Sequence, residues 1–315
     1  MTTLVLLDPS TPERLDRLRP FLPPGWLLTT ALSRAPQDQL AALQGAGFAI
    51  TGDVPVTEAM FAVPGLRAVH KWGVGFDGID LEAARRHGVR VLRTTGSNAV
   101  AVAETTLGLI LAVNRNIVRG HAGIAKGRWS KAEIAPVAAT LSGRTVGIVG
   151  MGRIGRAIAR RCHGGFAMEV VFFNRSAVTD LDFPARQIPD LNGMLEQADV
   201  AVVAVPGGAN TRHLIGAGQM TALGPRGYLV NVARGDVVDE AALIDALVNR
   251  RIAGAGLDVY EREPHVPQAL LDAPNATLLP HLGTATDDVR TDMGLRALSN
   301  LTAFAEGRDP HDRVT

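Results

Sequence analysis

The sequence contains one cysteine, three lysines and no apolar run long enough to cross a membrane. A single cysteine, Cys162, excludes an intrachain disulfide, and its apolar helical context predicts a small, inert core residue. A net charge of +1 provides no bulk electrostatic attraction to nucleic acids. The N-terminal apolar run has only the length of a strand and no basic flank, so no signal peptide is expected. These absences predict a cytoplasmic protein that binds neither nucleic acid nor membrane.

The most informative stretch that is present is a glycine motif. The apolar run Val146–Val149 breaks into G-x-G-x-x-G, and an Ala/Ile-rich helical pattern follows at once. In such a turn the first glycine permits the tight bend, the second lets the backbone approach a pyrophosphate, and the third lets helix and strand pack closely. The motif therefore predicts a dinucleotide site at a helix N-terminus. Its residues are Gly150, Gly152, Arg153, Ile154 and Gly155.

Strand-like and helix-like segments alternate through the first hundred residues, which predicts a parallel sheet with covering helices. The expected strands are Leu4–Leu7, Phe48–Thr51, Leu66–His70 and Val89–Leu92, and the expected helices are Pro12–Leu18 and Leu81–His87. A long helical pattern from Ala99 to Arg119 follows, and we interpret it as the bridge to a second domain.

A second alternating series starts at Val146 and is typical of a doubly wound nucleotide-binding fold. Six strands are expected, at Val146–Val149, Val170–Phe173, Val200–Val205, Tyr228–Val232, Gly254–Leu257 and Thr277–Leu279. Helices are expected near Gly155–Cys162, Leu191–Gln197 and Glu240–Asn249, the last capped by Asp239. The segment Thr284–Glu306 is again helical, and we expect it to cross back to the first domain.

The predicted fold class is therefore α/β, with two doubly wound parallel-sheet domains. A Rossmann cofactor domain, residues 99–283, is expected to be inserted into a flavodoxin-like substrate domain. Residues 1–98 and 284–315 would form that substrate-binding domain.

The end of the second Rossmann strand indicates which cofactor binds. A carboxylate at this point normally accepts from the adenosine ribose, but here the strand ends in Asn174, Arg175 and Ser176. Arg175 can pair with a 2′-phosphate and Ser176 can donate to it, while Asp180 and Asp182 lie too far downstream. We therefore favour NADP over NAD. The alternative is that Arg175 stacks on adenine or points to solvent.

Three polar residues follow late strands, where ligands bind in open α/β sheets: Arg234, Glu263 and His281. Together they suit the reduction of a 2-oxo acid. A histidine can deliver the proton that the carbonyl oxygen needs, and a neighbouring carboxylate orients its ring and raises its pKa. An arginine can grip the substrate carboxylate and polarise the carbonyl. Spacing alone leaves Glu261 as a competitor of Glu263, and each residue could instead have a purely structural role.

Over nearly its whole length the chain resembles the D-isomer-specific 2-hydroxyacid dehydrogenases, and among them the glyoxylate/hydroxypyruvate reductases. The segments that carry the resemblance are Gly73–Asp80, Val102–Glu104, Gly127–Trp129, Leu141–Gly155, Val230–Gly235, Leu257–Pro264 and Pro280–Thr286.

The resemblance implies a role for individual residues. His281 would be the acid/base, Glu263 (directly before Pro264) its partner, and Arg234 the group that binds the substrate. Backbone amides of Val74 and Gly75 would bind the substrate carboxylate, and Trp72 either narrows the pocket or is a core aromatic. Asp258 would contact the nicotinamide carboxamide. The remaining expected cofactor-binding residues are Val205, Pro206, Thr211, Val232 and Ala233. Homodimerisation through the cofactor domain is implied as well, and no metal is expected.

The sequence departs from the family pattern at two places. Gly207-Gly208 follows Val205-Pro206, where an apolar residue and threonine are usual, and Ala167 replaces a glycine. The first change could loosen the adenine side of the site, and neither touches the three polar residues. The expected reaction is reduction of small 2-oxo acids such as glyoxylate or hydroxypyruvate to D-2-hydroxy acids. The alternatives are a nucleotide-sensing binding protein similar to co-repressors, or a phosphoglycerate or phosphite dehydrogenase.

Overall fold

The computed structural model describes residues 1–315, which divide into two compact units. One unit consists of Met1–Asn98 and Thr286–Thr315, and the other of Ala99–Ala285. The chain thus leaves the first unit after Asn98 and returns to it at Thr286, where the sequence analysis expected 284.

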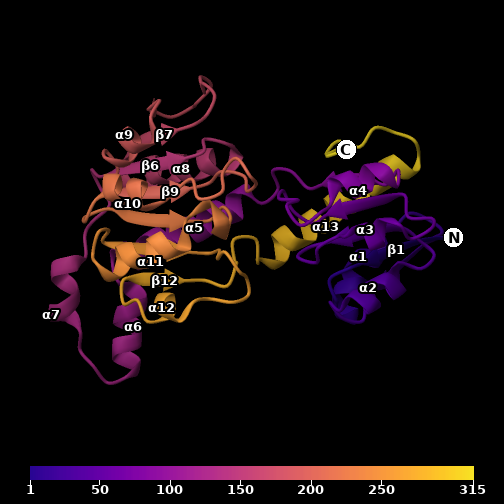
Figure 1. The fold of residues 1–315 in the computed structure, drawn as a ribbon, viewed down its shortest axis with the longest axis horizontal. Helices are drawn as coiled ribbons and strands as arrows, with labels where there is room; N and C mark the ends of the chain where they lie inside the picture. Colours follow the sequence, from indigo (N-terminus) through magenta and orange to yellow (C-terminus); the bar gives the residue numbers. More distant parts are fainter. The chain divides into compact units, whose positions relative to one another are not determined.

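The first unit is built on a five-stranded parallel sheet with the order β2-β1-β3-β4-β5. Figure 1 labels its strand β1 together with helices α1 to α4 and α13. Its strands are β1 (Thr2–Leu6), β2 (Trp26–Thr30), β3 (Ala46–Thr51), β4 (Ala68–Lys71) and β5 (Arg90–Arg93). Its helices are α1 (Pro12–Leu18), the 3-10 turn η1 (Arg19–Phe21), α2 (Pro36–Leu43), α3 (Glu58–Phe61), α4 (Leu81–Arg86) and α13 (Asp287–Ala305). This strand order is that of flavodoxin-like sheets.

Alternate residues of these strands face two separate cores, because successive side chains of a strand point to opposite faces. Leu4 and Phe48 pack with α1 and the returning α13 on one face. Val5 and Val69 pack with α3 and α4 on the other. The last helix, α13, belongs to the first unit.

The second unit contains a seven-stranded parallel sheet with the order β12-β11-β10-β9-β6-β7-β8. Its strands are β6 (Thr145–Val149), β7 (Glu169–Phe173), β8 (Arg186–Gln187), β9 (Val200–Val203), β10 (Tyr228–Asn231), β11 (Gly254–Leu257) and β12 (Ala276–Leu278). The strand order reverses between β6 and β9, which is the switch point where doubly wound sheets bind ligands. The predicted fold class, two doubly wound parallel sheets, is confirmed.

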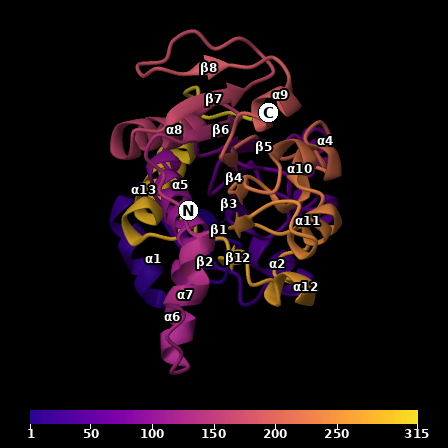
Figure 2. The same cartoon turned by 90° about the vertical axis from the view of Figure 1, so that its left-hand side faces the viewer.

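Helices cover both faces of this sheet (Figure 2). Buried residues of α5 (Ala99–Asn114) and α8 (Arg153–Phe166) form one core with the strands. Residues of α9 (Leu191–Leu195), α10 (Ala217–Leu223) and α11 (Glu240–Val248) form the other, and the short helices η3 (Gly235–Val237) and α12 (Gln268–Leu271) lie in loops. Asp239 caps α11 by accepting from the Ala242 amide, as predicted. Cys162 lies in the core on α8, where burial raises the pKa of its thiol to about 12.

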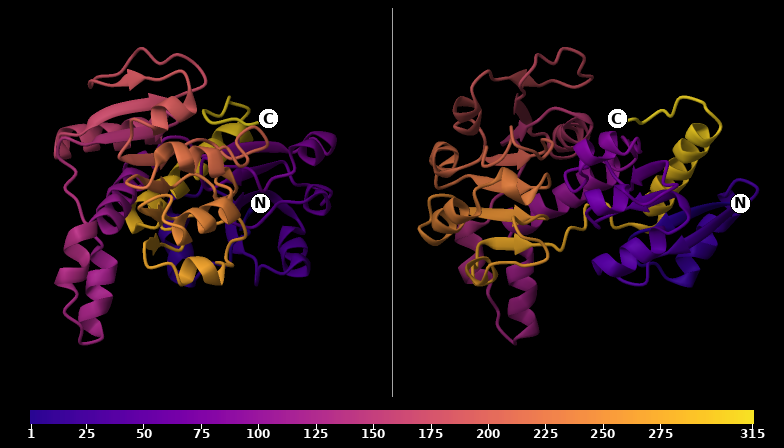
Figure 3. Two further views of the ribbon diagram at one scale, coloured as in Figure 1. Left: turned by 60° about the vertical axis from the view of Figure 1, so that its left-hand side comes forward. Right: turned by 45° about the vertical axis from the view of Figure 1, so that its right-hand side comes forward.

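The structure corrects several expected elements. The helix expected from Ala99 to Arg119 is broken, because Asn116 adopts a left-handed conformation with φ of 54°. After this break α6 (Ile117–Ala125), α7 (Lys131–Ile134) and η2 (Ala135–Val137) form an arm that projects from the second unit (Figure 3). Strand β2 and helices α2, α3, α10 and α12 were not expected, and the two-residue strand β8 makes the second sheet seven-stranded rather than six-stranded.

No single helix has the length and apolar composition needed to span a membrane. Only α5 and α6 pass such a test as a pair, and the chain bends by 65° between them.

Candidate active site

Three neighbouring strands of the second unit present polar residues at the same edge of the sheet. Strand β10 leads into Val232-Ala233-Arg234, β11 into Asp258, and β12 into Leu279-Pro280-His281. Because the strands are parallel and adjacent, their carboxyl ends meet at one edge. The loop after β11 carries Glu263 to this edge as well.

His281 and Glu263 form a direct pair. Nδ1 of His281 lies 2.8 Å from Oε2 of Glu263, and Oε1 of Glu263 accepts from the Tyr260 amide at 3.0 Å. Both carboxylate oxygens are therefore engaged, which fixes the carboxylate plane. Since a carboxylate can only accept, Nδ1 carries the proton of this hydrogen bond and Nε2 is left to face another group.

This pairing shifts both groups toward their charged forms. The hydrogen bond to Glu263 raises the pKa of His281 above its ordinary value, although burial opposes the shift. Burial by itself would raise the pKa of Glu263, but the hydrogen bond and charge of His281 bring that pKa below its ordinary value. The site thus favours a protonated His281 beside an ionised Glu263, which is the state in which His281 can act as a general acid.

Asp258 shapes the loop that carries His281. Its carboxylate accepts from the amides of Leu282 at 2.6 Å and Gly283 at 2.9 Å, while its carbonyl accepts from the His281 amide at 3.0 Å. His281 itself has a left-handed backbone with φ of 53°, which is uncommon for a residue with a side chain. The contacts with buried Asp258 hold this conformation in place. The contact of Asp258 with a nicotinamide carboxamide stays a prediction.

Arg234 lies at the end of β10, in a turn organised by buried Asn231. The Asn231 side chain donates to the Arg234 carbonyl at 2.9 Å and accepts from the Ala233 amide at 3.0 Å, and Arg234 Nη1 donates to the Ala233 carbonyl at 2.7 Å. Besides the causes given above, the positive charge of Arg234 lowers the pKa of both His281 and Glu263. The three residues are therefore close enough to interact electrostatically.

Gly235 explains how the loops after β10 and β11 come together. A Cβ atom built on Gly235 would lie 1.8 Å from the Tyr260 carbonyl carbon and 2.3 Å from the Glu261 nitrogen. Only glycine permits this backbone contact, which brings the residue after Arg234 directly against the loop that leads to Glu263.

The competitor Glu261 is engaged elsewhere. Its Oε1 lies 2.6 Å from Nε2 of His213, and Glu261 also exchanges backbone–side-chain hydrogen bonds with Glu240. The structure thus places Glu263, and not Glu261, beside His281. The His213–Glu261 pair was not found from the sequence, because His213 lies in the loop after β9 and only the tertiary fold brings it to this loop.

The glycine motif has the shape that a pyrophosphate needs. Gly150 has φ of 98°, and a Cβ on Gly155 would lie 2.1 Å from the Gly150 carbonyl oxygen, so both positions require glycine. Gly152 faces open space, with no atom within 4 Å of a built Cβ. No side chain caps α8, so the amides of its first turn, which begins with Arg153 and Ile154, remain open to an anion. These residues fit a bound dinucleotide.

The loop after β7 is ordered around Asn174. Its side chain accepts from the Met151 amide at 3.3 Å and donates to the Ser176 carbonyl at 2.9 Å. Arg175 is exposed and has no hydrogen bond or ion pair. The two downstream carboxylates, Asp180 and Asp182, pair with Arg156 at 2.8 Å and Arg160 at 2.6 Å on α8. The strand end therefore presents a cation and no available carboxylate.

The other predicted cofactor-binding residues lie along the same edge of this sheet. Val205 follows β9 and packs close to Gly150, and the Pro206 carbonyl accepts from the Thr211 hydroxyl at 2.7 Å. Val232 and Ala233 are buried directly after β10. The structure gathers all of them around the switch point and the strands beside it.

The remaining predicted residues, Trp72, Val74 and Gly75, belong to the loop after β4 of the first unit. Trp72 packs in a core with Leu18 and Met293, and Arg14 lies over its ring at 4.7 Å. This environment is that of a core aromatic, the second of the two interpretations of Trp72. The roles of Val74 and Gly75 stay predictions.

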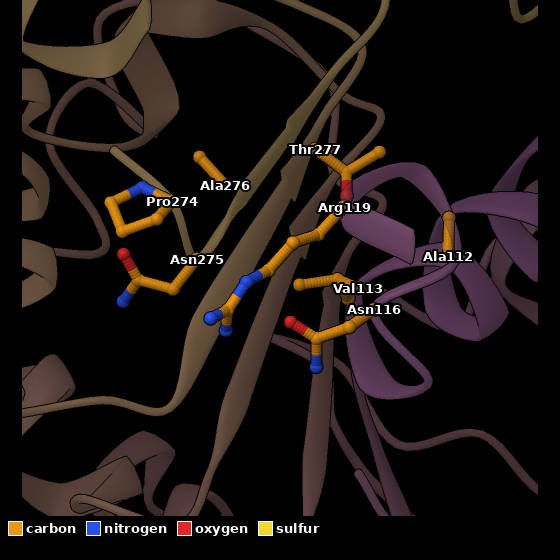
Figure 4. A pocket seen from close by; sticks show the side chains of 8 residues that line it. All are labelled: Ala112, Val113, Asn116, Arg119, Pro274, Asn275, Ala276 and Thr277. Atoms are coloured by element: carbon orange, nitrogen blue, oxygen red, sulfur yellow. The ribbon is translucent and has the colours of Figure 1, made fainter. Parts of the chain in front are cut away.

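A small crevice lies at the other end of the second sheet (Figure 4). Arg119 extends across it between Asn116 and Asn275, and Asn275 precedes β12 whereas His281 follows that strand. The crevice contains none of the predicted site residues. The residues that line it are Ala112, Val113, Asn116, Arg119, Pro274, Asn275, Ala276 and Thr277.

Comparison with known proteins agrees with the resemblance. The model of the D-isomer specific 2-hydroxyacid dehydrogenase NAD binding domain matches residues 107–283, more than half of the chain. The chain is 39% identical to a 2-ketogluconate reductase of Gluconobacter oxydans over 96% of its own length and 94% of that protein. It is 37% identical to a glyoxylate reductase of Thermococcus litoralis over 82% of its own length and 79% of that protein.

A solved structure is similar over the whole chain. It is that of an NADPH-dependent glyoxylate/hydroxypyruvate reductase from Sinorhizobium meliloti in complex with NADP and malonate. The two chains superpose with a TM-score of 0.87 at 36% identity, covering 100% of this chain and 97% of that one.

Proposed function

Because the chain belongs to the D-isomer specific 2-hydroxyacid dehydrogenase family, we propose that it reduces small 2-oxo acids such as glyoxylate and hydroxypyruvate to D-2-hydroxy acids, with NADPH in preference to NADH. The observation that carries this proposal is the His281–Glu263 pair, 2.8 Å apart, beside Arg234 at the carboxyl edge of the sheet. The names of the relatives and the NADP and malonate bound to the Sinorhizobium enzyme support the substrate class and the cofactor.

The cofactor would lie along the residues around the switch point. The open amides at the N-terminus of α8 would hold its pyrophosphate, with Gly152 leaving room for the approach. When bound, the reduced nicotinamide supplies the hydride for the substrate carbonyl carbon. The chain's own residues supply everything else that the reaction needs.

His281 would donate a proton from Nε2 to the carbonyl oxygen. Glu263 keeps the proton on Nδ1 during this transfer. After Nε2 has lost its proton, the imidazole is therefore neutral and still donates from Nδ1 to Glu263. Arg234 would bind the substrate carboxylate with its forked donors and polarise the carbonyl. In the oxidation direction the same residues act in reverse, with His281 as the base.

The preference for NADPH depends on Arg175. Replacing it with aspartate would remove the cation and place a carboxylate where ribose-binding enzymes have one. We expect Arg175→Asp to change the ratio of kcat/KM for NADPH to that for NADH by roughly a hundredfold in favour of NADH, since a charge-assisted pair is exchanged for repulsion. Arg186→Asp on neighbouring β8 is the control. It makes the same change of charge on the adjacent strand, but at an arginine whose guanidinium already donates to Gln197. An unchanged ratio in Arg175→Asp would mean that Arg175 does not bind the 2′-phosphate of NADPH.

The family resemblance implies a homodimer, and we propose that the projecting arm forms its interface. Several large apolar side chains on and beside the arm are about half exposed or more, as expected of a surface that is covered by a partner. They are Ile117 (53%), Val118 (50%), Ile124 (57%), Trp129 (80%) and Val137 (47%).

Replacing Ile124 and Trp129 together with aspartate should raise the dimer dissociation constant by roughly a hundredfold or more, because buried aromatic anchors dominate such interfaces. Light scattering after size exclusion would measure this. The control is Val248→Asp at the end of α11, which is 65% exposed but lies off the arm. A double variant that stays as dimeric as this control would rule out the arm as the dimer interface.

The cytoplasmic location stays a prediction.

Steady-state rates with a panel of substrates test the proposed reaction. The panel comprises glyoxylate, hydroxypyruvate, pyruvate and phenylpyruvate, each with NADPH and NADH, and includes 2-ketogluconate because one relative carries that name. Turnover of glyoxylate or hydroxypyruvate supports the proposal. Nicotinamide binding without turnover of any of these acids would favour the nucleotide-sensing alternative.

A further inference from the structure

The last residues of the chain form an extra edge on the sheet of the first unit. Strand β5 pairs with β4 on one side only, so its other side would be open. Residues Asp312–Thr315 run antiparallel along that side: the Val314 amide donates to the Val91 carbonyl at 3.0 Å, and the Arg93 amide donates to the Asp312 carbonyl at 3.0 Å. This segment thereby satisfies backbone groups that an exposed edge strand leaves unpaired.

Asp312 anchors this segment through its side chain, which is 3% exposed. One carboxylate oxygen accepts from the Thr95 hydroxyl, and the other lies 2.8 Å from Arg296 Nε and 3.2 Å from Asn300 Nδ2. Burial by itself would raise the pKa of Asp312, but these three hydrogen bonds keep it below its ordinary value. A buried charge that is fully paired in this way holds its partners in one arrangement, because losing a partner leaves the charge uncompensated.

The partners of Asp312 come from two different elements. Arg296 and Asn300 lie on α13, and Thr95 belongs to the loop that follows β5. Asn300 Nδ2 also lies 3.3 Å from the Arg93 carbonyl and 3.1 Å from Nε2 of His70, whose burial lowers its pKa to about 3 and keeps it neutral. The end of β5 is thus fixed by its backbone and by the side-chain network below it.

The end of β5 in turn holds the loop after β4. Arg93 Nη1 donates to the Val74 carbonyl at 3.4 Å, and its guanidinium lies 5.3 Å from the centre of the Phe76 ring. The Thr94 amide donates to the Gly73 carbonyl at 3.2 Å. A continuous series of contacts therefore leads from Asp312, through Arg93 and Thr94, to residues 73–76.

We propose that Asp312 is a positioning residue for the loop Gly73–Phe76. This inference rests on the proposed function and on the role that the family resemblance implies for the amides of Val74 and Gly75, which is to bind the substrate carboxylate together with Arg234. Amides that bind an anion must converge on it, and a loop displaced by a fraction of an ångström binds substrate less well. Asp312 acts through the end of β5 and does not touch the substrate.

The test compares Asp312→Asn with Asp309→Asn. Both remove one negative charge from the same segment, but Asp309 is 68% exposed and pairs only with Arg313. We expect Asp312→Asn to raise KM for glyoxylate roughly tenfold with kcat changed less than about threefold, because the loop binds substrate and does not transfer the proton. The dissociation constant for NADPH and the pH profile of the rate should match those of Asp309→Asn. A lower melting temperature with an unchanged KM would show a purely structural role and overturn the proposal.

Two further measurements test the contacts between the last residues of the chain and the loop Gly73–Phe76. If Asp312→Asn does not fold, Arg93→Lys tests the next contact with the last residues of the chain intact, and a normal KM in that variant contradicts the proposal. Hydrogen exchange at the amides of residues 73–76 reads the loop without any substrate, and it should be faster in Asp312→Asn than in Asp309→Asn. Equal exchange overturns the positioning role, whereas faster exchange in a protein that turns over no 2-oxo acid overturns the proposed function and leaves the control of the loop standing.

Discussion

Replacing His281 with asparagine should lower kcat for glyoxylate reduction by roughly a hundredfold to ten-thousandfold, the usual contribution of a positioned general acid. The amide is smaller than the imidazole, but its Nδ2 can take the place of Nδ1 and donate to Glu263, whereas it cannot deliver a proton to the substrate. Binding of NADPH, followed by fluorescence titration, should stay within about twofold of the wild type, because the glycine motif proposed to hold the pyrophosphate follows β6, whereas His281 follows β12.

The chain offers a matched control for this substitution. His213 also pairs with a glutamate, with Nε2 at 2.6 Å from Glu261 Oε1, and is similarly exposed (37% of its side chain against 41% for His281). His213→Asn therefore makes the same substitution in a second His–Glu pair of the same unit without touching the proposed acid, and it should change kcat only a few-fold. If both variants lose activity equally, or if neither does, His281 has no special role in the reaction.

Replacing Arg234 with lysine should reduce kcat/KM for 2-oxo acids by roughly a hundredfold to a thousandfold, the range found when a donor to a developing oxyanion is removed. The charge is kept, so any loss comes from the forked geometry, which a single ammonium cannot reproduce on a carboxylate and a carbonyl together. Steady-state kinetics with glyoxylate would measure the loss. We expect KM to rise and kcat to fall, since in its proposed role Arg234 both binds the substrate and polarises the carbonyl.

Arg226→Lys is the control for this second variant. Arg226 lies just before β10 and Arg234 just after it, so the same conservative change is made at opposite ends of one strand. Arg226 is exposed, and its replacement should leave the kinetics unchanged. An Arg234→Lys enzyme with a near-normal KM and kcat would remove Arg234 from the substrate site.

The sheets could be predicted from the sequence because buried parallel strands are short apolar runs set between turn residues. Val146–Val149 and Gly254–Leu257 are of this kind, and the structure has strands there. Strand β2 (Trp26–Thr30) was not predicted, because it is a partly buried edge strand that ends in two threonines and so lacks the continuous apolar run of a central strand. The break after Asn114 was not predicted because no glycine or proline marks it. The helix ends there because Asn116 adopts the left-handed conformation.

At the site, spacing gave the residue types but not their pairing, and only the family resemblance singled out Glu263 as the partner of His281. Glu261 and Glu263 are equivalent by spacing, and the structure separates them through contacts between distant segments. The Tyr260 amide donates to Glu263, whereas His213 pairs with Glu261. The network below β5 was equally invisible, since Asp312 meets Thr95 across more than two hundred residues of sequence.

If His281, oriented by Glu263, is the proton donor, then the rate of hydride transfer must depend on the protonation of its imidazole. Reduction needs the imidazolium, so its rate should be highest at low pH and fall as pH rises through the pKa of His281, which Glu263 raises above the ordinary value. In Glu263→Gln the same fall should occur at lower pH, because the stabilising charge is gone. Deuterated NADPH would verify that hydride transfer limits the rate. A pH-independent rate in the wild type, with a full isotope effect, would show that His281 does not donate the proton.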